Sequence, residues 1–198
     1  MPIADEEAVR LLLVDFHDRL RKVVDDAWAE WLDISWRGRL VYEPRARAVL
    51  VFDFIARRAR DEFAGDPNIH VITKKQTVSF LFRDQVHIRF KKGNAKGVGS
   101  NIVTQAVLDI IDPQRTIPGL VPDIMKVEVC WSPDDLGIDL DEVAVVARDK
   151  TKRIWAYPIE RREIASTVVP MPTRGPDESP PELVPRVPLS IEGEKDKE

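Results

Sequence analysis

The sequence predicts an α+β fold: two long N-terminal helices packed on a mostly antiparallel sheet of about five strands, with one short inserted helix. Three observations predict it. Apolar residues recur at helical spacing up to about residue 65, they alternate with polar residues at strand spacing beyond it, and a proline-rich segment follows. We therefore expect a single α+β domain over residues 1–165 and a disordered, proline-rich and charged tail over residues 166–198.

The two helices are expected before residue 65. From Asp5 to Leu32 apolar side chains recur every three or four residues. The second helix is expected to begin at Pro44, whose fixed φ suits the first helical position, and to end at Gly65. Its middle, residues 48–56, is apolar nearly all round, so we expect it to be buried on more than one side. Three tryptophans near the end of the first helix are expected to cover one end of the core: Trp28, Trp31 and Trp36.

A hairpin is expected from residues 77–82 and 86–91, in which apolar and polar residues alternate. The apolar faces of the two strands coincide only if Arg83–Gln85 forms a three-residue loop. This register pairs Phe82 with Val86, Phe80 with Ile88, and Val78 with Phe90. The other face then carries a largely basic surface, which we expect to be exposed: Thr77, Ser79 and Leu81 opposite Lys91, Arg89 and His87.

The remaining elements follow a glycine-rich loop. A short helix is expected from Asn101 to Ile111, and a strand over residues 125–131. The last hairpin pairs residues 143–148 with residues 153–159 and sets Asp149 opposite Lys152. From Pro170 to Pro188 there are seven prolines in nineteen residues, and a segment of this kind does not offset its own ordering entropy.

Composition excludes several classes of protein. The single cysteine, Cys130, rules out an internal disulfide or a multi-cysteine metal site, and the three histidines show no ligand-like spacing. Apolar stretches are too short to cross a bilayer, and the N-terminus is acidic where a signal peptide is basic, so we expect a cytoplasmic protein without membrane contact. A net charge of −4 argues against coating of nucleic acid in bulk.

The segment Lys91–Asn101 most resembles a binding site. A strand, a glycine-rich loop and a helix N-terminus together present backbone N–H groups to an anion. The segment lacks the Gly-Lys-Ser/Thr ending of a P-loop and the dinucleotide fingerprint, so an ordinary surface loop is the alternative. The candidate phosphate- or nucleic-acid-binding residues are His87, Arg89, Lys91, Lys92, Lys96, Gly97, Gly99 and Ser100.

Other candidates are weaker. Hard cations take oxygen ligands, which makes three acids weak metal candidates: Glu128, Asp134 and Asp135. However, Lys126–Glu128 reverses the acid-x-lysine order of restriction-type nucleases, so a solvated acidic turn is favoured and no metal or cofactor is expected. Cys130 is expected to be a small packed side chain, Asp53 to pair with an arginine or to lie at a face edge, and three residues of the first helix to lie at the surface: Asp15, His17 and Asp18.

Two classes of function remain open. The first is an intracellular, non-enzymatic interaction or regulatory protein, of a bacterial antitoxin-like or accessory kind, which binds a protein partner through charged patches and the flexible tail. The second is a nucleic-acid- or nucleotide-binding enzyme, of the metal-dependent nuclease or phosphotransfer type, that uses residues 91–101. The first is favoured because no set of acid, base and nucleophile stands out, and the catalytic residues of the second stay unknown.

Overall fold

The first part of the chain is helical, as the spacing of its apolar residues predicts. The computed structural model describes residues 4–74, 77–94, 97–99, 112 and 124–161, which belong to one compact unit running from Met1 to Arg162. A short 3-10 turn, η1, interrupts the expected first helix, so that it forms two pieces around this turn. The helical elements are α1 (Glu6–Leu13), η1 (Val14–Phe16), α2 (His17–Asp33), α3 (Trp36–Leu40) and α4 (Pro44–Phe63).

Local signals fix the helix ends. The Asp5 carboxylate accepts a hydrogen bond from the Ala8 N–H at 2.9 Å and so caps the start of α1. Pro44 is the first residue of α4, and Gly65, with φ of 75°, lies just beyond its end. The predicted bounds of α4 are confirmed to within two residues.

The strands form one six-stranded mixed sheet in the order β1-β2-β3-β4-β5-β6. All neighbours are antiparallel except β3 and β4, which are parallel and are separated by about thirty residues, as a parallel connection requires. The sheet has one strand more than predicted, because β1 is an edge strand in which only the first residue, Ile69, is buried. The strands are β1 (Ile69–Lys74), β2 (Thr77–Phe82), β3 (Val86–Lys92), β4 (Met125–Pro133), β5 (Leu140–Asp149) and β6 (Lys152–Pro158).

The predicted hairpin registers are confirmed where pairs are described. Phe80 lies opposite Ile88 and Phe82 opposite Val86, across the predicted three-residue loop. In the last hairpin Asp149 lies opposite Lys152. Requiring the apolar faces to coincide was therefore enough to set the register.

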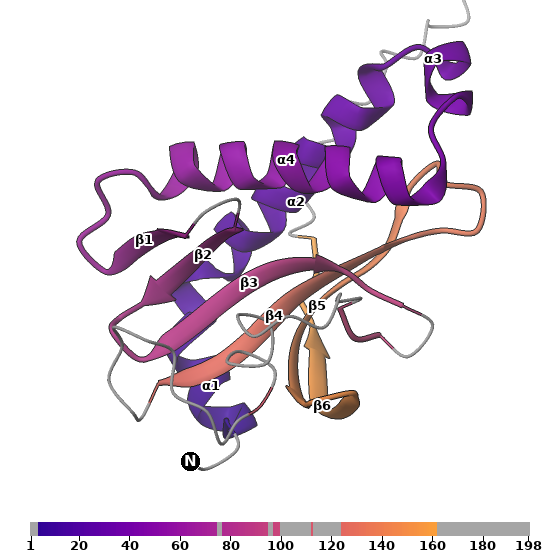
Figure 1. The fold of residues 1–198 in the computed structure, drawn as a ribbon. Coiled ribbons are helices and arrows are strands. Elements are labelled where there is room, and N and C mark those ends of the chain that lie inside the picture. Colours follow the sequence, from indigo (N-terminus) through magenta and orange to yellow (C-terminus); the bar gives the residue numbers. More distant parts are fainter. Residues whose placement is uncertain (1–3, 75–76, 95–96, 100–111, 113–123, 162–198) are drawn as a thin grey trace, which may run out of the picture. The chain divides into compact units, whose positions relative to one another are not determined.

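The main core lies between the helices and one face of the sheet. Figure 1 shows α2 and α4 on the same side of the strands, and buried residues from both helices and the sheet form one cluster. Its centre includes Phe63 of α4, whose ring meets the rings of Phe80 and Phe82 edge-on, with centroids 5.4 Å apart in both pairs. Trp28 and Trp31 are buried in this core as expected.

One expectation about burial near α3 was wrong. Trp36 is 62% exposed and does not cover the core. The middle of α4 contacts both α2 and the sheet, so it is buried on more than one side as expected. Val49 is nevertheless exposed, and Asp53 lies at the exposed edge of the helix, which is one of the two positions expected for it.

Two predicted segments lie outside the described residues: the short helix at 101–111 and the tail at 166–198. Among the residues that are described, no helix has the length and apolar character needed to cross a membrane.

Candidate functional site

Strand β3 carries four of the candidate anion-binding residues, but not as one exposed basic surface. Because side chains alternate along a strand, His87, Arg89 and Lys91 share one face and Lys92 lies on the other. His87 and Arg89 are buried, and Arg89 is only 3% exposed, so the predicted exposure of these two residues was wrong. The residues of β2 on that face are buried as well: Ser79 and Leu81. Alternation shows which residues share a face, but not whether that face meets solvent.

The buried side chains of this second face form a polar cluster centred on Glu128. Arg89 of β3 lies opposite Glu128 of β4 in the parallel pair. Arg148 of β5 donates from Nη1 to Glu128 Oε2 at 3.1 Å, and the Gly99 N–H donates to the same oxygen at 3.2 Å. The carboxylate is 1% exposed, so this is a buried, hydrogen-bonded ion pair. Small apolar residues surround it: Val98, Cys130, Ala144 and Val146.

Burial shifts the proton equilibria of this cluster. The pKa of Lys91 is lowered to about 8, chiefly by desolvation and then by the nearby Arg89 guanidinium, while Glu128 opposes the shift. Desolvation also lowers the pKa of His87 to about 3, so that this imidazole is neutral at physiological pH. Burial raises the pKa of the Cys130 thiol, which fits the predicted packed side chain rather than a reactive nucleophile.

The described part of the glycine-rich loop is closed on itself. Gly93 pairs with Gly99, and the N–H groups of Asn94 and Gly97 donate to the carbonyls of Val98 and Asn94 at 2.9 and 2.8 Å. Close packing explains why residue 99 is a glycine. A Cβ at this position would lie 2.6 Å from both Glu128 Oε2 and Lys91 Cβ. These described N–H groups therefore donate within the fold, and the anion cradle of residues 91–101 stays a prediction. Two candidates, Lys96 and Ser100, lie outside the described residues.

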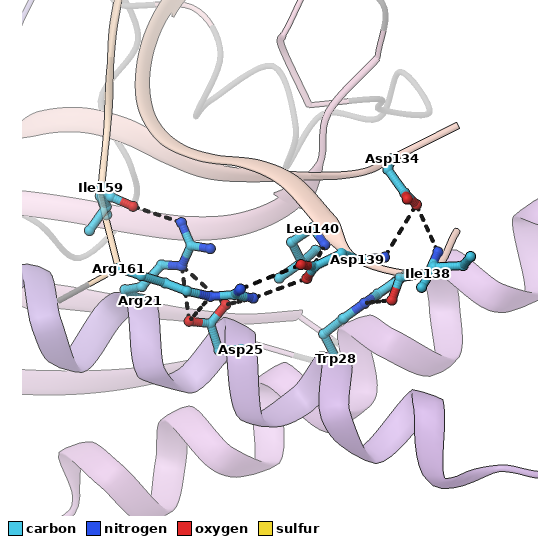
Figure 2. A network of polar contacts seen from close by, with 9 residues as sticks. All are labelled: Arg21, Asp25, Trp28, Asp134, Ile138, Asp139, Leu140, Ile159 and Arg161. Atoms are coloured by element: carbon cyan, nitrogen blue, oxygen red, sulfur yellow. Dashed lines mark hydrogen bonds and ion pairs between the residues drawn. The ribbon is translucent and has the colours of Figure 1, made fainter. Parts of the chain in front are cut away.

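The weak metal candidates do not gather at one place in the described structure. Glu128 is held by Arg148, while Asp134 turns to its own loop and accepts from the N–H of Ile138 at 2.7 Å (Figure 2). Asp135 is exposed. Within the described residues no three histidine, cysteine, aspartate or glutamate side chains group so as to hold a metal ion.

Figure 2 also shows how the acidic loop is fastened to α2. Arg161 donates to Asp25 of α2 at 3.2 Å and to Asp139 of the loop at 3.1 Å. Arg21 completes the network, because it donates to Asp25 and to the carbonyl of Ile159. The hydrogen bond from Arg161 lowers the pKa of Asp139. The network is structural, because Asp25 and Asp139 already have a cationic partner.

Of the three first-helix residues expected at the surface, two are exposed and one is not. Asp15 and Asp18 are exposed, as predicted, but His17 is half-buried and lies 3.0 Å from the hydroxyl of Tyr157. Burial lowers the pKa of His17. The prediction of a surface position was wrong for His17, because its partner comes from the last strand, 140 residues away.

Sequence reasoning missed an apolar surface on the helices. We call it the α3–α4 surface: Trp36, Leu40, Val41, Tyr42 and Val49, with Arg37, Arg39 and Arg45 close to them in sequence. Its most exposed members are Leu40 at 74% and Val41 at 77%. A groove of about 490 Å³ runs along the start of α4, between Tyr42 and Asp53. The sequence signal was the run Trp36–Val49, whose apolar residues follow no single helical face.

No protein-family model, curated protein or solved structure matches the chain. Its function is therefore inferred from its own geometry.

Proposed function

We propose that this protein is a non-enzymatic interaction protein that binds an acidic, amphipathic segment of a protein partner at the α3–α4 surface. The observation that carries the proposal is the combination of exposed apolar side chains with arginines that form no ion pair with any residue the structure describes. Large exposed apolar patches on soluble domains commonly mark interaction sites. Tryptophan, tyrosine and arginine are also the residues that contribute most to binding at protein interfaces, and all three occur here.

The charges favour an acidic partner. Among the described residues, no ion pair involves the arginines of this surface, although Arg37 stacks on the ring of Trp36 with its guanidinium carbon 5.3 Å from the ring centre. Farther along α4 the situation differs, because Arg57 and Arg58 both pair with Glu30 of α2. Arg57 and Arg58 are thus paired within the molecule, although their neighbour Arg60 forms no ion pair with a described residue. At the start of α4 the groove is lined by Arg45 together with Glu43 and Asp53, and the arginines of the α3–α4 surface outnumber these two acids.

A pair of designed helical peptides tests the proposal. Both peptides carry the same leucine stripe, and one has glutamate and the other lysine on the polar face. We expect the glutamate peptide to bind the full-length chain at least tenfold more tightly than the lysine peptide. Binding should also shift the fluorescence of Trp36, which is exposed in the free protein.

Two variants and a control locate the binding. The first variant combines Leu40→Ser, Val41→Ser and Val49→Ser, and should lose peptide binding without unfolding, because all three side chains are exposed. The second, Arg37→Glu with Arg45→Glu, should invert the preference between the peptides. The control is Leu11→Ser, a substitution of a similarly exposed leucine on α1, at the other end of α2.

Three results would overturn the proposal. These are equal binding of the two peptides, unchanged binding by the serine variant, and equal loss of binding in the Leu11→Ser control. If sedimentation shows a dimer of the free chain that the serine variant abolishes, the surface belongs to a second copy and the acidic-partner proposal is wrong.

A further inference from the structure

Among the described residues, the buried polar face of the sheet carries more cations than carboxylates. Arg89, Lys91 and Arg148 meet there with Glu128, as their mutual electrostatic effects show. Three cations and one carboxylate leave an excess of two positive charges among these four described groups. Lys126, which also faces His87, donates to the Asp112 carbonyl at 3.1 Å and lies outside this group of four.

Two buried side-chain nitrogens of this face lack the hydrogen bonds that burial requires. Arg89 Nη1 and His87 Nδ1 are both buried and have no hydrogen-bond partner within the described structure. Arg89 and His87 are two residues apart on one face of β3, which puts their Cα atoms about 7 Å apart. Buried polar atoms are nearly always paired, and an unpaired one indicates a missing acceptor.

We propose that Arg89, with His87 and Lys91, binds a phosphate group of a small molecule. A phosphate dianion matches the excess of two positive charges and supplies oxygen acceptors for the unpaired Arg89 nitrogen. Glu128 lies opposite Arg89 on the neighbouring strand but accepts a side-chain hydrogen bond from Arg148, and Arg89 Nη1 is left for the phosphate. A neutral His87 donates one hydrogen bond to the same anion if Nδ1 carries its proton.

The burial of these residues favours a single phosphate group over a nucleic-acid strand. A nucleic-acid strand needs an open groove along several phosphates. Arg89 and His87 are 3% and 1% exposed and Lys91 is partly exposed, so these residues do not line an open groove, and the ligand we propose is a single phosphate group. The proposed phosphate site is therefore different from the exposed nucleic-acid surface expected from the sequence. It is also independent of peptide binding at the α3–α4 surface.

Calorimetric titration of the full-length chain tests this site. The probes are inorganic phosphate, adenosine monophosphate and a single-stranded oligonucleotide. We expect saturable binding of one of the first two, accompanied by a rise in the thermal unfolding midpoint. Preference for inorganic phosphate identifies the free ion as the ligand, and preference for the monophosphate identifies a phosphate ester.

Matched variants assign the binding to the proposed residues. Arg89→Leu and Lys91→Gln should each weaken binding at least tenfold. Lys92→Gln is the control, because Lys92 is adjacent in sequence but lies on the opposite face of β3. Lys91 is partly exposed, so Lys91→Gln provides a folded variant even if Arg89→Leu does not fold.

The proposal is overturned if neither phosphate nor the monophosphate binds the wild-type chain. It is also overturned if Lys91→Gln binds as tightly as Lys92→Gln, or if only the oligonucleotide binds. None of these results bears on peptide binding at the α3–α4 surface, so the two proposals fail separately.

Discussion

The two faces of the sheet are built from the same strands and are both buried, but they achieve burial in opposite ways. On the helix side, β3, β4 and β5 contribute apolar residues such as Ile88, Val129 and Val145, which pack against α2 and α4. On the other side, the alternate residues of the same strands include Arg89, Glu128 and Arg148. The first arrangement stabilises the fold directly through apolar burial.

The second arrangement costs free energy unless each charge is matched. Desolvating an ion is expensive, and a buried ion pair repays that cost only with good geometry and complete hydrogen bonding. Glu128 meets this condition, but Arg89 Nη1 does not. This contrast between the two faces is the basis of the proposed phosphate site on the polar face.

The largest expected effect comes from removing the acid at the centre of the polar face. Glu128→Ala leaves Arg148 and Arg89 as buried cations without their carboxylate, which should lower the free energy of unfolding by about 3–5 kcal/mol. Urea denaturation at pH 7 measures this loss. On the helix face, Ile88→Val removes one buried methylene and should cost only about 1 kcal/mol.

An exposed acid provides the control for Glu128. Glu142→Ala on β5 should change stability by no more than about 0.5 kcal/mol. If Glu128→Ala is as mild as this control, the polar face is not an electrostatically coupled cluster, and the contrast between the faces fails.

A smaller effect with a distinct pH dependence is expected at Lys91. Its pKa in the folded protein is about 8, against an ordinary value of 10.5. Between these values the unfolded chain keeps a proton that the folded chain has released, so wild-type stability rises with pH across this window. Below pH 8 the charged lysine destabilises the fold, and Lys91→Met should be more stable there by about 1 kcal/mol, since partial exposure screens the effect.

The measurement is urea denaturation from pH 7 to pH 10.5 without phosphate. The advantage of Lys91→Met should shrink as pH rises and disappear near pH 10.5. Lys91→Arg is the matched control, because arginine stays charged throughout this range and should show no such convergence. If the stability difference between Lys91→Met and wild type stays constant with pH, the pKa of Lys91 is not lowered in the folded protein.

The sequence predicted the helix face well and the polar face poorly. Helical spacing and alternation identified α4, the β2–β3 register and the last hairpin, because each of these depends on residues close in sequence. Strand β1 was missed because an edge strand with one buried residue has almost no apolar alternation.

The polar cluster could not be predicted from the sequence, because it depends on contacts between strands that are far apart in the chain. Glu128 and Arg148 meet because β4 and β5 pair, and Arg89 lies beside Glu128 because β3 and β4 pair in parallel. A polar residue in an alternating strand ordinarily indicates solvent, so Arg89 and His87 were expected to be exposed. Nothing short of the sheet order distinguishes a solvated polar face from a buried one.

The smallest effect is expected at the rim of the helix face, where charges pair near solvent. Arg161 joins Asp25 and Asp139, but its side chain is 49% exposed, in contrast to 8% for Arg148. Arg161→Ala should therefore lower the free energy of unfolding by no more than about 1 kcal/mol. Because the pKa of Asp139 is lowered in the folded state, this stabilisation is present above its ordinary pKa of 3.8 and is lost as pH falls below it.

Denaturation at pH 7 and at pH 3 measures both parts of this prediction. The difference between wild type and Arg161→Ala should be smaller at pH 3. Arg60→Ala on α4, at an exposed arginine for which the described structure shows no ion pair, should give no difference at either pH. A loss at Arg161 as large as the loss at Glu128 would mean that burial does not set the strength of these pairs, and the distinction between the two faces would then need another cause.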